Sequence, residues 1–233
     1  MSGPPPFAPA DWIGVRLVVF DVDGTLYRQR PLRLRMARDL MIHTLLRRDF
    51  ETITVLAKYR RIRERLGDRQ VEDFAPILLA EAAAAASCPV QRVSAIVEEW
   101  INRRPLPYLR HCRYAGLAAL FDGLRRNGKS IGVLSDYPAR EKLDALGLRA
   151  DHVVWAGDTD AGMLKPHPRG LQALMKAAGA EPGATLMIGD RADRDGETAR
   201  RAGARALLRS ARPLDGWQTF ARFDDAVFAP MIG

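Results

Sequence analysis

The sequence predicts an α/β protein in which a doubly wound parallel sheet is interrupted by a block made only of helices. Short apolar runs rich in β-branched residues alternate with single amphipathic helices over the second half of the chain. One more such run stands alone near the N-terminus, and the segment between the two regions has helical periodicity throughout. The simplest architecture is therefore one α/β core with a helical cap inserted after its first strand.

A chain of 233 residues is long enough to bury one large core and a smaller satellite core. We expect the α/β core to comprise residues 14–27 and 106–233, and the all-α cap residues 28–105. Residues 1–13 are rich in proline and lack the basic start and apolar block of a secretory signal, so they are expected to form a loose leader.

The isolated run, Arg16–Phe20, is typical of a strand buried on both faces. It ends in a turn, because Gly24 breaks the pattern two residues after Val22. In the helical block, Ser87 and Pro89 suit the start of a helix, and Pro105 with Pro107 is expected to close the block like a hinge. The expected cap helices cover residues 32–46, 51–66, 71–86 and 89–103.

Beyond the cap, strands and helices alternate in the order of a parallel sheet. The segment after Trp217 is expected to pack on the core, and its pattern leaves helix or strand open. Strands are expected at 130–134, 152–155, 185–188 and 205–208, and helices at 116–127, 139–146, 169–178 and 195–202.

Composition limits the classes of function. The chain is 47% hydrophobic, but its most apolar window, Phe74–Ala86, is cut by Glu81, so no membrane-spanning segment and no membrane partner are expected. Two cysteines, Cys88 and Cys112, form neither a disulfide framework nor a zinc motif and are expected to be small buried residues. Without an export signal, the cytoplasm is the expected compartment.

The net charge of +8 is concentrated in the cap region. Between Leu26 and Arg110 there are 17 arginines and lysines against 10 acidic residues, which is nearly all of the excess. A basic segment attracts phosphorylated metabolites, nucleic acid or acidic lipid. The simpler interpretation, a solvated helical surface, is the one we favour, and nucleic acid is not an expected partner.

Polar residues follow the predicted strands at the edge where ligands bind in open α/β sheets. Carboxylates gathered at one edge would repel by about 4 kcal/mol per pair at 4 Å in an effective dielectric near 20, so either some of them are protonated or a cation holds them together. An all-oxygen ligand set favours Mg²⁺, and a lysine beside it suits a transferring phosphoryl group. The residues concerned are Asp21, Asp23, Ser135, Asp136, Lys165, Asp190, Asp193 and Asp195.

A single aspartate after a strand is usually a turn former or a helix cap. That interpretation does not explain four motifs that follow one another along the chain, each at the carboxyl end of a strand. The four segments are DVDGTLY from Asp21, VLSDYP around Ser135, KPHP at Lys165, and IGDRADRD from Ile188 to Asp195. Together they resemble the motifs of the haloacid dehalogenase superfamily of aspartate-nucleophile phosphotransferases. The resemblance implies a Rossmann-like core with a helical cap between the first and second motifs.

The resemblance also implies roles. Asp21 would be the nucleophile that forms an aspartyl-phosphate, and Asp23 would protonate the leaving oxygen and then activate water. Ser135 and the amide of Asp136 would hold the phosphoryl oxygens, and Lys165 would neutralise Asp21 and the phosphate. Asp136 departs from the pattern, because many relatives carry asparagine there.

For the metal, the resemblance implies that Mg²⁺ is bound by Asp21, Asp190 and the backbone carbonyl of Asp23, with Asp195 acting through water. Asp193 would be a supporting residue, paired with Lys165. Dehalogenating relatives do not keep a carboxylate two residues after the nucleophile, so dehalogenation is not expected here.

The leading hypothesis is a Mg²⁺-dependent phosphatase acting on a small phosphorylated metabolite. A phosphomutase using the same intermediate is one alternative, and a non-catalytic protein that uses its basic cap for binding is another. The intact set of repelling carboxylates disfavours the second alternative. Cap arginines nearest the nucleophile can meet an anionic substrate, although residues at i and i+2 of a helix cannot all face one site. They are Arg28, Arg30, Arg33 and Arg35.

Overall fold

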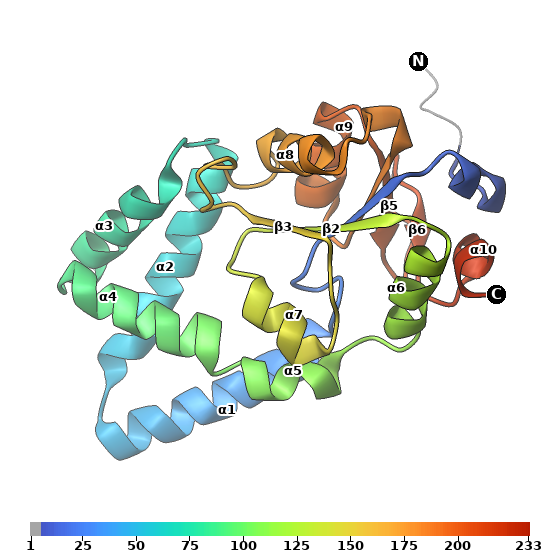
Figure 1. Cartoon of the computed structure of the whole chain (residues 1–233). Coiled ribbons are helices and arrows are strands. Elements are labelled where there is room, and N and C mark those ends of the chain that lie inside the picture. The colour runs from blue at the N-terminus through green and yellow to red at the C-terminus, as the bar shows by residue number, and fades with distance from the viewer. Residues whose placement is uncertain (1–5) are drawn as a thin grey trace.

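The computed structural model describes residues 6–233 and shows a parallel six-stranded sheet in the order β3-β2-β1-β4-β5-β6 (Figure 1). The strands are β1 (Leu17–Phe20), β2 (Ser130–Ser135), β3 (His152–Trp155), β4 (Thr185–Gly189), β5 (Arg205–Arg209) and β6 (Thr219–Phe220). The α/β class, the parallel sheet and the helical insertion after the first strand are confirmed.

Helices cover both faces of the sheet, as a doubly wound fold requires (Figure 1). One face packs on α8 (Arg169–Ala178) and α9 (Glu197–Arg201), with Leu171 and Leu174 against Val19. The other face packs on α6 (Leu117–Arg126), α7 (Arg140–Leu146) and α10 (Ala229–Ile232). The apolar runs of the strands are therefore explained by burial on both faces.

β1 is central and completely buried, and it positions the site. Phe20 pairs with Val133 of β2 and with Ile188 of β4, so the residues after these three strands meet at one edge. The backbone amide of Asp21 donates to the carbonyl of Ile188 at 2.9 Å. This bond extends the β1–β4 pairing to the first residue beyond β1.

The insertion contains α1 (Gln29–Arg47), α2 (Phe50–Asp68), α3 (Phe74–Ala86) and α4 (Val90–Val97), continued by a π-helical segment, Glu98–Arg103. It has its own apolar core, in which α2, α3 and α4 pack together and Trp100 is buried. At the start of α2, the Asp49 side chain accepts a hydrogen bond from the Thr52 amide at 3.0 Å, a helix N-cap.

Three expectations about the insertion need correction. Pro105 and Pro107 do not end the helical block but begin a further helix, α5 (Leu106–Cys112), because proline is tolerated in a first helical turn. Ser87 does not cap α4; it follows α3 in a left-handed conformation, and Pro89 occupies the N-cap position. α2 also runs past Gly67 to Asp68.

The two chain ends also differ from expectation. Within the leader expected over residues 1–13, residues 9–13 form a short 3-10 helix, and Phe7 and Trp12 are buried against the core, while residues 1–5 lie outside the described residues. The C-terminal segment contains both a strand, β6, and a helix, α10. Phe220, Phe223 and Phe228 pack with Trp12, so apolar side chains hold both ends.

Both cysteines are free; Cys112 is buried and Cys88 half-buried. Within residues 6–233, no single helix is long and apolar enough to cross a membrane. One pair, α3 with the segment Val90–Cys112, passes that test by length and composition only, and it is bent by 108°.

Candidate active site

Asp21 lies buried at the carboxyl end of β1, held by two neighbours. Its Oδ1 is 2.5 Å from Lys165 Nζ, and its Oδ2 accepts a hydrogen bond from Thr25 Oγ1 at 2.9 Å. The chain then turns sharply at Gly24, which has φ +112°. A Cβ there would lie 2.1 Å from Asp190 Oδ2, so only glycine lets this turn pass beside the second carboxylate.

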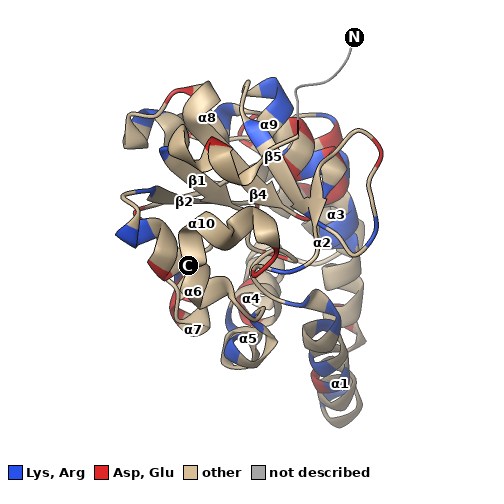
Figure 2. Ribbon diagram, turned by 90° about the vertical axis from the view of Figure 1, so that its right-hand side faces the viewer, with Lys and Arg blue, Asp and Glu red and all other residues tan. Residues whose placement is uncertain are grey.

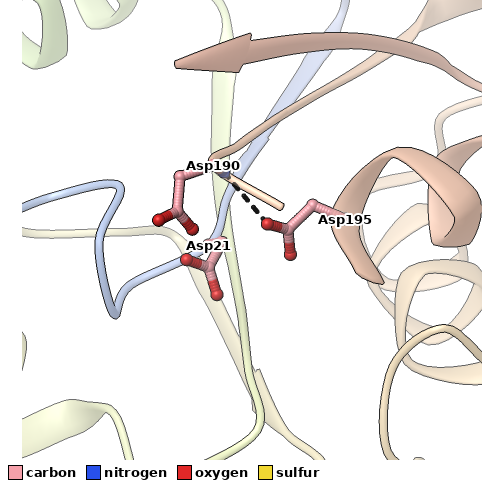
Figure 3. A group of neighbouring side chains, drawn as sticks. All are labelled: Asp21, Asp190 and Asp195. Carbon is pink, nitrogen blue, oxygen red and sulfur yellow. Dashed lines mark hydrogen bonds between the residues drawn. The ribbon is translucent and has the colours of Figure 1, made fainter. Parts of the chain in front are cut away.

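Asp190 and Asp195 come from the loop after β4. Asp195 Oδ2 accepts hydrogen bonds from the amides of Asp190 and Arg191, both at 3.0 Å, and its Oδ1 is 2.6 Å from Lys165 Nζ. Asp21, Asp190 and Asp195 each offer an oxygen, and these oxygens all lie within 4.8 Å of one another (Figure 3). Strand ends far apart in sequence therefore build one acidic cluster.

Burial and mutual repulsion perturb this cluster. Burial, with the nearby charges of Asp195 and Asp190, raises the pKa of Asp21 to about 8, although Lys165 opposes the shift. Burial, with the charge of Asp195, raises the pKa of Asp190 to about 6. Burial would lower the pKa of Lys165, but Asp195 and Asp21 raise it, so this lysine stays charged.

Asp23 is not part of the cluster and has other partners. Both of its carboxylate oxygens contact Lys142 Nζ, at 2.7 and 2.8 Å, and one also accepts a hydrogen bond from the Tyr27 hydroxyl. Burial would raise the pKa of Asp23, but the charge and hydrogen bonds of Lys142 and the Tyr27 bond lower it. Its backbone carbonyl accepts from the Gln29 side-chain amide, so here this predicted metal ligand has another partner.

Ser135 and Asp136 follow β2 at the same edge. Ser135 is buried, and its Oγ accepts a hydrogen bond from the Tyr137 amide at 3.1 Å. Asp136 Oδ1 accepts from the backbone amide of Lys165 at 3.0 Å. The second motif thus fixes the backbone of the third, beside the lysine that contacts Asp21.

Asp193 does not pair with Lys165 as predicted. It is exposed and binds Arg191, at 2.7 Å between Oδ2 and Nη2, while Asp195 makes the contact with the lysine. Asp195 thus makes the lysine contact that was predicted for Asp193. The π-helical turn Ala192–Gly196 explains this difference, because Asp195 is buried in it and Asp193 stays at the surface.

Two buried arginines, which the motif pattern did not single out, join the insertion to this edge. Arg63 of α2 donates to the Asp136 carbonyl at 3.0 Å and lies 3.5 Å from the centre of the Tyr137 ring. Arg194 donates to the Lys165 carbonyl at 2.9 Å and contacts Glu64 and Asp68 of α2.

Gly67 makes room for Arg194, since a Cβ there would approach the Arg194 Nη1 to 2.8 Å. Lys142 and Tyr27 were also missed. For Lys142 a signal existed, because lysine is scarce in this chain and two of five lysines lie in the site.

Two cavities flank the cluster. A void of about 10 Å³, enough for one water molecule, lies between Arg63, Arg194 and Lys165, so the insertion closes over this side. A cavity of about 670 Å³ lies beside the N-terminal half of α1 and reaches Asp190. Its walls are Gly24, Gln29, Arg30, Arg33, Leu34, Ala37, Tyr114, Asp190 and Arg209.

The donor set fits a magnesium ion. The three side chains offer only oxygen, and among the described residues no hydrogen-bond donor engages the Asp190 carboxylate, although it lies beside Asp21. Asp195 is already satisfied by two amides and a lysine, which suits an outer role. Oxygen-only sites with few carboxylates are those that Mg²⁺ occupies.

A Rossmann-like sheet, a helical insertion after its first strand and a buried acidic cluster at the strand ends define a class of capped α/β hydrolases. The chain belongs to the haloacid dehalogenase-like hydrolase family, whose sequence profile matches residues 15–203. The family resemblance drawn from the four motifs is thereby confirmed.

Relatives span nearly the whole chain. A phosphoglycolate phosphatase of Rhodospirillum rubrum is 32% identical over 219 residues, covering 90% of this chain and 87% of its own. A 2-haloacid dehalogenase of Pseudomonas syringae shares the fold with a TM-score of 0.63 at 19% identity, covering 92% and 98% of the two chains. YfnB of Bacillus subtilis, in a structure bound to magnesium, has a TM-score of 0.61 at 17% identity, covering 93% and 98%.

Proposed function

We propose that the protein is a Mg²⁺-dependent phosphatase that hydrolyses a small phosphorylated metabolite through an aspartyl-phosphate. The observation that carries the proposal is the contact of one buried lysine with Asp21 and Asp195, beside Asp190, at the carboxyl edge of the sheet. A site that only binds anions has no need of three converging carboxylates. A site that forms a covalent bond to phosphorus needs one of them as nucleophile.

In the first half-reaction, an Asp21 oxygen attacks phosphorus and the bond from phosphorus to the ester oxygen breaks. Ser135 and the amide of Asp136 hold the equatorial oxygens, and Lys165 offsets the charge that accumulates on them. Lys165 already contacts Asp21, so this compensation is in place before substrate binds.

In the second half-reaction, Asp23 takes a proton from water, the water oxygen attacks phosphorus, and the bond to Asp21 breaks. Beside Lys142, Asp23 is ionised, which is the form that can accept a proton from water. Its earlier role, protonation of the leaving oxygen, requires it to leave Lys142, take up a proton from solvent as its pKa rises, and turn toward Asp21. We therefore expect substrate binding to shift Asp23 from the position seen here.

Mg²⁺ bound by Asp21 and Asp190, with Asp195 outside them, would supply positive charge to the phosphoryl oxygens. The Asp23 carbonyl can complete this set once Gln29 releases it. Support for the metal comes from the oxygen-only donors and from the magnesium-bound relative of the same fold.

The intact Asp23 favours phosphoester hydrolysis over dehalogenation, and the relative named as a phosphoglycolate phosphatase makes phosphoglycolate the first substrate to test. The cavity beside Asp190 presents Arg30, Arg33 and Arg209, which suit a substrate with a second negative group.

The test is hydrolysis of p-nitrophenyl phosphate and of phosphorylated metabolites, including phosphoglycolate, with Mg²⁺ and with the metal chelated. We expect turnover with Mg²⁺ only, and catalytic efficiencies that identify the preferred metabolite. Full turnover in chelator would remove the metal from the proposal. Return of the phosphoryl group to the substrate skeleton, detected by product analysis, would indicate a mutase.

A further inference from the structure

The proposed function leaves the outer face of α1 unexplained. Leu32, Met36 and Leu40 of this helix pack inward, and its opposite face is apolar as well. α1 packs mainly on α5 and α2 and projects below the rest of the molecule in Figure 2. We define the outer apolar face as six side chains of α1 and the start of α2 with exposed fractions of 41% to 77%: Met41, Ile42, Leu45, Leu46, Phe50 and Ile53.

The spacing shows that these side chains form a face. Met41 and Leu45, and likewise Ile42 and Leu46, are four residues apart, which places each pair on one side of the helix. Phe50 and Ile53 continue it into the first turn of α2. An exposed helix normally carries polar residues on this side, and a contiguous apolar surface marks a site of interaction.

The unpaired charge beside this face is positive. Residues 38–53, which carry the face, contain three arginines and three acidic residues. Asp39 and Asp49 are engaged by Tyr108 and Thr52, and Glu51 pairs with Arg92. By contrast, no residue among 6–233 forms a hydrogen bond or ion pair with Arg47 or Arg48. An apolar occupant that carries negative charge complements this arrangement.

We propose that this face docks on an anionic membrane surface, with the apolar side chains in the interface and the arginines at the headgroups. A helix with Leu and Phe on one side and arginines beside them has the composition of an interfacial helix. The tip formed by the end of α1 and the start of α2 projects outward, and a deformable bilayer surface accepts a projecting tip.

A second copy of the chain fits less well. Antiparallel pairing of two α1 helices would bring Arg30 and Arg33 of one copy beside Arg47 and Arg48 of the other, and like charges would meet. A protein partner with an acidic helix also fits less well. Such a helix binds in a groove, whereas here α1 itself projects from the molecule.

The proposal departs from the expectation of no membrane partner. That expectation rested on the absence of a long apolar run, and polar residues interrupt this face in the sequence at helical spacing. A run-length criterion detects segments that span a bilayer, whereas a helix lying on it is recognised only once its exposed face is known.

The experiment is co-sedimentation of the full-length protein with two sets of vesicles, phosphatidylcholine alone and phosphatidylcholine mixed with phosphatidylglycerol. We expect binding to the mixed vesicles that weakens with salt. The triple variant Leu45→Gln/Leu46→Gln/Phe50→Gln should bind at least about a hundredfold more weakly. Arg47→Gln/Arg48→Gln should lose roughly thirtyfold, and only on anionic vesicles.

Ile13→Gln is the matched control, because Ile13 is 90% exposed and ends the short 3-10 helix near the N-terminus, which lies at the opposite end of the molecule from α1 (Figure 1). It should bind vesicles like the unchanged protein, and all variants should keep the same phosphatase turnover and thermal midpoint. This readout does not depend on catalysis, so failure of the proposed function would leave it interpretable.

Absence of binding to anionic vesicles would overturn the proposal. So would equal loss in the Ile13 control. A dimer in solution that the triple variant dissociates, without vesicle binding, would overturn it in favour of a second copy.

Discussion

The site has two sides, one around Asp21 and one around Asp23. These residues lie two positions apart on the chain, but their surroundings shift their pKa values in opposite directions. Asp21 faces two carboxylates and one lysine, and its pKa is raised to about 8. Asp23 faces Lys142 and the Tyr27 hydroxyl, and its pKa is lowered. The partners that each side chain meets, and not its motif position alone, therefore set its charge state.

The strongest test of the Asp21 side is Asp21→Asn. The amide cannot attack phosphorus, so we expect phosphatase turnover to fall by at least about 10⁴-fold. Turnover on p-nitrophenyl phosphate measures the effect, and Asp193→Asn is the control, because Asp193 is exposed and outside the cluster. Near-normal turnover in Asp21→Asn would place the nucleophile elsewhere.

The Asp23 side is tested by Asp23→Asn. Loss of an acid and base group should lower turnover by about 10²- to 10⁴-fold while the phosphoryl group still transfers to Asp21 with an activated ester. Rapid-quench measurement should then show phosphorylated protein accumulating. If no phosphoprotein accumulates and turnover is unchanged, the two aspartates do not divide the chemistry as proposed.

Lys142→Gln tests how Lys142 affects Asp23 while the Asp23 carboxylate itself is kept. Since Lys142 lowers the pKa of Asp23, its removal should raise that pKa and move the acidic limb of the rate profile to higher pH. We expect roughly a tenfold loss of turnover at neutral pH. The double variant with Asp23→Asn should be no worse than Asp23→Asn alone, and Lys176→Gln on the exposed side of α8 is the control.

The smallest expected effect concerns stability. With its pKa near 8, folded Asp21 keeps a proton that the unfolded chain releases near pH 4, so stability falls as pH rises between these values. Asp21→Asn does not titrate, and its advantage in chelator should grow across this window to about 2–4 °C in thermal midpoint at pH 8. A midpoint below that of the unchanged protein at pH 8 would show that Asp21 stabilises the fold.

Much of the fold was predictable because buried strands and capped helices leave local signals. The lone run at Arg16–Phe20 and the helical block after it were enough to infer a sheet with an insertion. Local signals failed where tertiary packing decides. The prolines at 105 and 107 begin a helix instead of ending one, and burial of Phe7 and Trp12 orders part of the expected leader.

In the site, the motifs led to Asp21, Asp190 and Asp195, which the fold brings together. They did not lead to Arg63 or Lys142, because contacts across the insertion or from a helix face have no fixed spacing from a motif. Asp193 and Asp195 show the limit most clearly. Both follow the same strand, and only the π-helical turn determines which one meets Lys165.

Arg194 should make the contact between the insertion and the sheet edge sensitive to ionic strength. One guanidinium joins the carbonyl of Lys165 to Glu64 and Asp68 of α2, and these two acids are largely exposed. Dissolved ions screen such pairs, so rising salt should loosen the insertion from the sheet edge while leaving the Lys165 contact with Asp21, which is buried, almost unscreened. Salt should therefore change access to the cluster without changing the charge balance within it.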